Sequence, residues 1–177
     1  MLGRVELPEK IYPGMVKVGF GDVGIFDKRK SRAIWEVCGE VRFKGKADIG
    51  HGSKICVGEN AALTIGKNFN ITAESSIVCF KAINLGNDCL IAWNVMIIDT
   101  DFHRMYCSNE LMNPDKPISI GDRVWIGMNT KILKGALISN DSVVAAGALV
   151  NRQFDRKNVL LAGVPAKVVK ESVTWEV

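Results

Sequence analysis

The segment "IGDRVWIGMNTKILKGALISNDSVVAAGALV", residues 120–150, repeats with a period of six residues. An aliphatic residue begins each hexad, and four positions later comes a residue that is small or β-branched. An α-helix, with 3.6 residues per turn, would scatter the aliphatic positions around its circumference, so the period argues against a helix. The aliphatic positions are Ile120, Ile126, Ile132, Ile138, Val144 and Val150, and the second set is Val124, Thr130, Ala136, Ser142 and Ala148.

The same period continues upstream, interrupted by slips of two residues. One run extends from Ile65 to Ile83 in steps of six, and the next extends from Leu85 to Ile97. A six-residue unit suits a short strand plus a corner, so three units predict a triangular coil of about eighteen residues, with longer corners at the slips. Stacked coils would pair into three parallel sheets around columns of aliphatic side chains. The alternative is an ordinary all-β domain with coincidental spacing.

Length and composition fit a single domain. The chain has 177 residues, which is enough to bury a sizeable core. No apolar run approaches the roughly eighteen residues that a membrane span needs. The N-terminal "MLGRVELPEK" lacks the apolar core of a signal peptide. We therefore expect a cytoplasmic protein that does not bind membranes.

The repeat also suggests a division of the chain. Residues 31–43 alternate apolar and polar side chains, which predicts a half-buried strand that enters the first coil. Residues 1–40 are expected to cover that coil, and residues 41–171 to form the β-helix. Residues 172–177 are expected to form a C-terminal tail.

Cysteines and charge narrow the class of ligand. The five cysteines are odd in number and lack CxxC spacing, which predicts reduced thiols, with neither disulfides nor a metal site. Residues 151–170 hold five bases and one acid and so account for the whole net charge of +4. Nucleic acid would favour a broader basic stripe with stacking aromatics, and this segment has only Phe154. The basic cluster suits a small polyanionic ligand, or it is a solvated tail.

Residues 99–118 have no six-residue period and contain His103, one of two histidines in the chain. Loops on a rigid scaffold frequently carry binding and catalytic residues. A smooth prism offers no pocket, so an inserted loop is expected to help form one. His51, in "IGHGSK", is expected at the surface or at a corner of the coil.

Four stretches sharpen this pattern: "DTDFH" at 99–103, "KPISIGDRVWIG" at 116–127, "VVAAGALV" at 143–150 and "LAGVPAKVVK" at 161–170. Together they resemble the hexapeptide-repeat acyltransferases, and within them the branch that acetylates sugars and other small acceptors from acetyl-CoA. The resemblance covers about residues 41–171. It implies an all-β, left-handed parallel β-helix, with an inserted active-site loop and a short C-terminal tail or helix. It also implies a homotrimer with active sites at the subunit interfaces.

The resemblance places the catalytic histidine at His103. A hydroxyl is a poor nucleophile while it keeps its proton, and histidine, with a pKa of about 6.5 in peptides, is a natural general base. Asp99, Asp101 or a backbone carbonyl is the candidate to hold the other ring nitrogen, and Asp101 is equally a candidate to bind the acceptor's hydroxyls. No Ser or Cys stands in a nucleophile motif, and the resemblance implies direct transfer in a ternary complex, without an acyl-enzyme.

The resemblance also implies a site for acetyl-CoA. The Met128 N–H corresponds to a cofactor-contacting position, although Met departs from the small polar residue that is frequent there. Trp125 is expected to point outward near the acyl-donor channel, or else to pack against a neighbouring subunit. The small residues around Ala146 would leave a groove for the pantetheine arm. The residues expected to meet the phosphates are Arg152, Lys167 and Lys170.

Several alternatives remain. The lead acceptor is a hydroxyl of a sugar or of a polysaccharide precursor. The second possibility is an amino sugar attached to a nucleotide, or a small xenobiotic. A γ-class carbonic anhydrase would need three zinc-binding histidines, and the chain has two. A non-catalytic solenoid scaffold would have no need of His103 or of the basic cluster.

Overall fold

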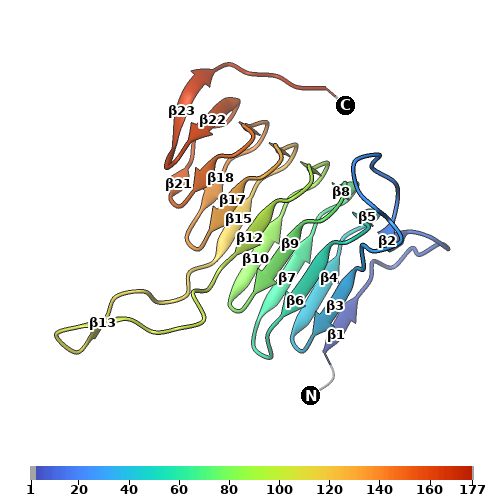
Figure 1. The fold of residues 1–177 in the computed structure, drawn as a ribbon, viewed down its shortest axis with the longest axis horizontal. Coiled ribbons are helices and arrows are strands. Elements are labelled where there is room, and N and C mark those ends of the chain that lie inside the picture. The colour runs from blue at the N-terminus through green and yellow to red at the C-terminus, as the bar shows by residue number, and fades with distance from the viewer. Residues whose placement is uncertain (1–2, 177) are drawn as a thin grey trace.

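The computed structural model describes residues 3–176, which form a three-sided prism of stacked coils (Figure 1). The first side, sheet A, runs in the order β1 (Arg4–Glu6), β4 (Glu40–Phe43), β7 (Ala62–Ile65), β10 (Ala82–Leu85), β15 (Ile118–Ile120), β18 (Leu137–Ile138) and β21 (Gln153–Phe154). Sheet B runs in the order β2 (Val16–Phe20), β5 (Ala47–Gly50), β8 (Phe69–Ile71), β11 (Leu90–Ile91), β16 (Trp125–Ile126), β19 (Val143–Val144), β22 (Val159–Gly163) and β23 (Ala166–Glu171). Sheet C runs in the order β3 (Ile34–Val37), β6 (Lys54–Val57), β9 (Ser76–Cys79), β12 (Met96–Ile98), β17 (Lys131–Leu133) and β20 (Leu149–Val150).

Strand register confirms the coil lengths that the sequence predicts. Ile120 pairs with Ile138 and Ile126 with Val144, so this coil spans eighteen residues. In the coil that contains the two-residue slip, Ile71 pairs with Ile91, twenty residues away. The extra residues lie in the corners, because the paired aliphatic positions stay in line.

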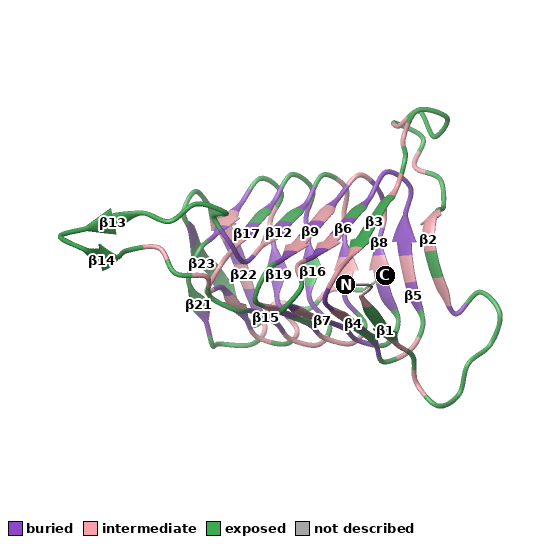
Figure 2. Cartoon of the chain, turned by 90° about the horizontal axis from the view of Figure 1, so that it is seen from below, coloured by how far each residue is buried: buried purple, intermediate pink, exposed green. Residues whose placement is uncertain are grey.

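The core is the set of columns that the hexads predict. All six aliphatic positions between 120 and 150 are at most 3% exposed, and the small residues of the same hexads are buried beside the corners. Each coil buries its aliphatic side chains against the coils above and below, so stability builds up along the stack. Figure 2 shows the buried residues running along the inside of the prism.

The corner between sheets A and B is built around one residue per coil with a positive φ. These residues are Asn68, Asp88, Arg123, Asp141 and Asn158. Four of the five are Asn or Asp, which tolerate this conformation better than most residues with a side chain. Asn87, Asp122 and Asn140 accept hydrogen bonds from backbone N–H groups at the same corner, which joins one coil to the next.

The two ends of the chain differ from the central coils. The segment expected to cover the first coil contributes β1, β2 and β3, each paired in parallel with a strand of the next coil. Residues 31–43 form two strands, β3 and β4, with a corner between them. The C-terminal segment, for which the sequence left a tail or a helix open, folds back as β23 antiparallel to β22 and continues as an extended tail (Figure 1). Residues 3–176 include no helix that could cross a lipid bilayer.

Candidate active site

The inserted loop leaves the prism after β12 and returns at β15. Ile97 pairs with Ile132, thirty-five residues away, so the loop adds seventeen residues to an eighteen-residue coil. Its outer end is a small hairpin of β13 (Tyr106–Cys107) and β14 (Glu110–Leu111). Figures 1 and 2 show this hairpin standing away from the prism. The loop departs from the corner between sheets C and A.

Asp99 fixes the start of the loop and is fully buried. Its carboxylate accepts hydrogen bonds from the backbone N–H groups of Phe80, Lys81 and Ala82 at 2.6, 2.9 and 2.8 Å. These three donors belong to the same corner of the preceding coil. Asp99 therefore holds the prism together where the loop leaves it, and among the described residues its carboxylate makes no bond to the ring of His103.

Asp101 is held by two partners. Lys134 Nζ lies 2.5 Å from Asp101 Oδ2, and Asn113 Nδ2 donates to the same oxygen at 2.9 Å. The hydrogen bond from Lys134, followed by the one from Asn113, lowers the pKa of the Asp101 carboxyl below its ordinary value. In this structure Asp101 is thus tied to other protein side chains and does not contact the imidazole of His103.

His103 follows a tight turn and is exposed. Phe102 has a φ of 60° and donates its N–H to Thr100 Oγ1 at 3.0 Å, and the His103 N–H donates to the Asp101 carbonyl at 2.6 Å. The side chain borders a shallow hollow of about 410 Å³. This hollow is lined by Phe80, Lys81, Thr100, Phe102, His103, Arg104, Leu111, Asn113, Pro114 and Asp115.

The other histidine, His51, lies at a corner of the coil between β5 and β6, one of the two places expected for it, but it is buried there and not at the surface. His51 is 1% exposed, and its Nδ1 lies 3.1 Å from Ser31 Oγ. The ring of Phe26 packs edge-on against it with centroids 6.0 Å apart. Residues 26–31, which come from the N-terminal segment, cover this corner and bury the imidazole. The sequence repeat gave no sign of that cover.

Three of the predicted site residues meet in one apolar groove on sheet B. Trp125, Met128 and Ala146 all line it, and its volume is about 490 Å³. It is continued by Leu90 and Val143, which lie on neighbouring strands. The remaining lining residues are Thr72, Ala92, Trp93, Gly127, Val144, Ala145, Trp175 and Glu176. Small side chains at 145 and 146 leave the backbone accessible on one side of the groove.

The corner between sheets B and C brings backbone amides to this groove. Thr130 Oγ1 donates to the Gly127 carbonyl at 2.7 Å, and the Gly147 N–H donates to the Met128 carbonyl at 2.8 Å. A Cβ on Gly127 would lie 2.6 Å from the Ala146 nitrogen, so only glycine permits this close approach. The N–H groups of Met128 and Ala146 donate to no acceptor within residues 3–176. They remain free to bind a carbonyl oxygen.

Trp93 and Trp175 also line the groove, and neither was predicted. Trp93 occupies the same position in its coil as Met128, because Leu90 pairs with Trp125, so the register alone would have found it. Trp175 lies in the C-terminal tail, outside the repeat, and no sequence signal indicated it. Its ring centroid is 6.2 Å from that of Trp125.

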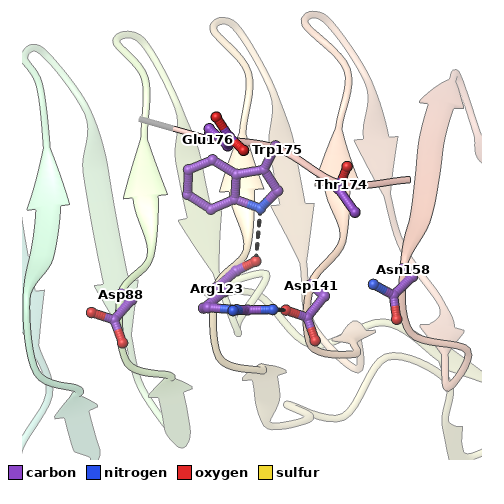
Figure 3. A pocket seen from close by; sticks show the side chains of 7 residues that line it. All are labelled: Asp88, Arg123, Asp141, Asn158, Thr174, Trp175 and Glu176. Atoms are coloured by element: carbon purple, nitrogen blue, oxygen red, sulfur yellow. Dashed lines mark hydrogen bonds and ion pairs between the residues drawn. The ribbon is translucent and has the colours of Figure 1, made fainter. Parts of the chain in front are cut away.

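Trp175 and Glu176 line both the apolar groove and a polar pocket at the corner of sheets A and B. Figure 3 shows the side chains of the polar pocket. The indole N–H of Trp175 donates to the Arg123 carbonyl at 2.9 Å, and Arg123 forms an ion pair with Asp141. The tail is also held by hydrogen bonding between Val173 and Asn158. These contacts place the tail against the prism.

The predicted basic residues gather at the C-terminal end of the prism. Arg152 lies over the ring of Phe154, 5.1 Å from its centroid, and donates to the Ala166 carbonyl at 3.3 Å. Arg152 and Lys167 line one hollow of about 440 Å³. Lys170 lies further along β23, outside this hollow, but on the sheet that carries the apolar groove. Arg152 follows β20 at the corner between sheets C and A, and its hollow shares no lining residue with the apolar groove.

The structure does not bring His103 to the groove within one chain. His103 projects from the corner between sheets C and A, whereas the groove lies on sheet B and at its corner with sheet C. Among the described residues, none lines both hollows. No group of three or more potential metal ligands occurs in the described part of the chain.

A three-sided parallel β-helix with a projecting loop and an apolar groove along one side defines the structural class of the protein. A family model described as "Hexapeptide repeat of succinyl-transferase" matches residues 117–152. The WbbJ protein of Escherichia coli (strain K12), provisionally named as an O-acetyl transferase of lipopolysaccharide biosynthesis, is 28% identical over 152 residues, which cover 78% of this chain and 77% of WbbJ.

Two solved structures are also similar. The polySia specific acetyltransferase NeuO has a TM-score of 0.62 and 30% identity, covering 82% of this chain and 63% of NeuO. A galactoside acetyltransferase in complex with coenzyme A has a TM-score of 0.62 and 32% identity, covering 75% of this chain and 64% of that protein. The chain therefore spans somewhat less than two thirds of these two proteins.

The chain is similar in sequence and in fold to hexapeptide-repeat acetyltransferases, and its fold is the left-handed parallel β-helix. The fold class that the sequence predicted is thereby confirmed, and these matches support the predicted family. Because the relatives include proteins with additional segments, the activity of this chain has to be argued from its own site.

Proposed function

We propose that this protein transfers an acetyl group from acetyl-CoA to a hydroxyl of a saccharide. The observation that carries the proposal is the apolar groove, in which Trp125, Met128 and Ala146 line a channel with free backbone N–H groups. The pantetheine arm of coenzyme A is a narrow chain with amide groups. It suits a groove of this shape in which amides are available for its carbonyls. The coenzyme A complex of the galactoside acetyltransferase supports this choice of donor.

The basic residues at the C-terminal end of the prism are proposed to bind the phosphate groups of coenzyme A. Arg152 and Lys167 line one hollow, and Lys170 follows on β23. Guanidinium and ammonium groups are the usual partners of phosphate oxygens. These side chains are exposed, so their contribution to binding is expected to weaken as salt screens the charges.

His103 would act as the general base. In the ternary complex the imidazole takes the proton of the acceptor hydroxyl as its oxygen bonds to the thioester carbonyl carbon. A backbone N–H such as that of Met128 donates to the resulting oxyanion. The carbon–sulfur bond then breaks, the imidazolium returns its proton to the departing thiolate, and the acetyl ester and free coenzyme A remain.

Such a site requires a second copy of the chain. His103 and the groove lie on different sides of one prism, and the loop carries exposed apolar side chains, including Phe102, Met105 and Met112. A loop of this kind suits docking on a neighbouring subunit, and a closed ring of three copies would provide three equivalent sites. The homotrimer with interfacial sites is thus part of the proposal.

The acceptor class rests on the relatives. WbbJ is named for lipopolysaccharide, and the two structures for polysialic acid and for galactoside, so each name points to a saccharide. We take a sugar hydroxyl as the acceptor here too. Acetylation of an amino sugar or of a xenobiotic remains the alternative outcome of an acceptor screen.

The test measures thiol release from acetyl-CoA over a panel of mono- and oligosaccharides, nucleotide-linked amino sugars and xenobiotics. His103→Ala is expected to lower kcat by about 10²–10⁴-fold, the usual contribution of a general base. Binding of acetyl-CoA, followed by calorimetry, is expected to stay unchanged. Undiminished turnover in the variant would contradict the assignment of His103. Failure of acetyl-CoA to bind or to raise the melting temperature would favour a non-catalytic scaffold.

Complementation tests the interfacial site. Ala146 is exposed in the groove, so Ala146→Trp should fill the channel without disturbing the core. If loop and groove come from different copies, co-expression of Ala146→Trp with His103→Ala restores sites that have both parts intact, roughly a quarter of all sites in a random closed oligomer. A mixed preparation as inactive as its two components would contradict interfacial sites.

A further inference from the structure

The base of the inserted loop is closed by three side chains, Asp101, Asn113 and Lys134, which we call the clasp. Asn113 Nδ2 donates to Asp101 Oδ2 and to the His103 carbonyl, both at 2.9 Å, and its Oδ1 accepts the Met105 N–H at 2.6 Å. A single amide group thus makes hydrogen bonds on both sides of His103. The hydrogen bonds of Asn113 therefore join the outgoing and the returning segment of the loop next to His103, the proposed base.

Lys134 connects the clasp to the prism. Ile98 pairs with Leu133, so Lys134 follows β17 at the place where the loop departs in the preceding coil. Its Nζ donates to Asp101 Oδ2 at 2.5 Å and to the Asn113 carbonyl at 2.8 Å. Its side chain is only 18% exposed. The partly buried ammonium group of Lys134 therefore bonds to both segments of the loop, to the outgoing one at Asp101 and to the returning one at Asn113.

The acids of "DTDFH" then divide into two anchors. Asp99 points to the preceding coil and is satisfied by its backbone, while Asp101 is bound by the following coil through Lys134. His103 comes two residues after the second anchor. The loop is thereby tied to the coils on either side within five residues of its departure. Its return is tied as well, by Lys134 to the Asn113 carbonyl and by Lys81 Nζ to the Asp115 carbonyl at 3.0 Å, so among the described residues the loop lacks a hydrogen bond to the coils only between Asp101 and Asn113.

We propose that Asn113 and Lys134 are positioning residues for His103, and that Asp101 is the anchor they share. The proposal rests on the function proposed for His103. Asp101 Oδ2 accepts hydrogen bonds from both partners, so the contacts that place the loop also fix the orientation of this carboxylate.

The clasp would act through geometry. A catalytic group displaced by about 1 Å can cost about 100-fold in rate, because the reacting atoms no longer meet in a near-attack arrangement. The His103 ring makes no hydrogen bond to another described residue, so its place depends on its backbone. Loss of the clasp should therefore lower kcat and leave donor binding in the groove of the other copy unaffected.

The first experiment compares Asn113→Ala and Lys134→Ala with wild type. Both are expected to lower kcat by about 10–100-fold, with the KM for acetyl-CoA and the melting temperature unchanged. Lys134→Arg keeps the charge and should recover part of the loss. Asn109→Gly is the matched control, because Asn109 lies in the same loop with a φ of 67°, which glycine adopts readily, and should retain wild-type kcat. Unchanged kcat in Asn113→Ala, or equal losses in the control, would overturn the proposal.

A double-mutant cycle separates positioning from a direct role. If Asn113 acts through His103, adding Asn113→Ala to His103→Ala should cause no further loss of the residual rate. Multiplicative losses would show that Asn113 acts independently of the imidazole, and would overturn the proposal.

Hydrogen exchange tests the clasp without any need for activity. The Met105 amide donates to Asn113, so exchange in residues 101–105 should become faster in Asn113→Ala and Lys134→Ala but not in Asn109→Gly. Unchanged exchange would overturn the proposal. A wild-type protein that releases no thiol from acetyl-CoA would count against the proposed function, and the exchange rates would still decide whether the clasp orders the loop.

Discussion

The coils of the prism and the loop inserted between them are built on different principles. In the coils, each position repeats the environment of its equivalent in the coils above and below, so Ile91, Ile126 and Val144 form one buried column. In the loop every contact occurs once: Asp99 bonds to backbone amides, Asn113 to the turn, and Lys134 to Asp101. The repeated burial of aliphatic side chains stabilises the coils, whereas individual hydrogen bonds hold the loop in its position.

This difference separates stability from function. Residues 101–112 are all exposed, and few of them contribute to the core, so the loop can change with little cost to folding. The prism supplies a regular wall and a groove, and the loop supplies His103, the proposed base. The proposed chemistry needs both parts, and the clasp is where they are joined.

The largest expected loss of stability follows from a substitution in the repeated core of the coils. Ile126→Ala should lower the free energy of unfolding by about 2–5 kcal/mol, because Ile126 is fully buried and its loss leaves a cavity inside the stack. Chemical denaturation would measure the change. The matched substitution in the loop, Tyr106→Ala, should stay within about 0.5 kcal/mol of wild type. Equal losses at the two positions would contradict the division between coils and loop.

A smaller effect is expected at the junction of the two regions. Asp99→Asn keeps the shape of the side chain but removes one acceptor, which leaves the partly buried backbone N–H groups of residues 80–82 short of a partner. We expect a loss of about 1–3 kcal/mol in the free energy of unfolding. Denaturation gives this value, and exchange of the amides of Lys81 and Ala82 should rise with it. An unchanged unfolding curve would show that Asp99 does not hold the junction.

The smallest effect on stability is expected from alkylation of the cysteines, whose thiols should react at different rates in the coils and in the loop. Burial, and then the nearby Asp99 carboxylate, raise the pKa of Cys79 to about 12, and burial raises that of Cys89 to about 11. At pH 8 both therefore remain protonated and should resist a thiolate-dependent alkylating agent. Cys107 is exposed in the loop hairpin and should react first, with no change in melting temperature. Mass spectrometry of modified peptides would test this order, and early labelling of Cys79 would contradict it.

Much of the prism was predictable because its signals are local and repeated. The positions of the buried aliphatics, the eighteen-residue coil and the longer corners follow from counting residues between Ile65 and Val150. Met128 and Trp125 were singled out by the resemblance, and Ala146 by its run of small residues; the structure places all three in one groove. Trp93 has the same register as Met128 and was missed.

The contacts of the loop were not predictable in this way. His103 was singled out by its position, but nothing in the sequence indicated that Asp99 serves backbone amides, or that Asp101 is bound by a lysine thirty-three residues later. The burial of His51 at its corner was missed for a similar reason, because the N-terminal segment that covers it carries no repeat. Trp175 reaches the groove from a tail that follows the last coil.

By itself the sequence determined the prism, because a period of six residues leaves the aliphatic positions only one consistent way to be buried in every coil. It also determined which residues face outward along the groove. Only the tertiary structure decided where the loop is anchored, what its two acids hold, and that His103 and the groove lie apart on one chain. Those outcomes depend on unique contacts between segments that are distant in sequence, and no pattern repeats often enough to encode them.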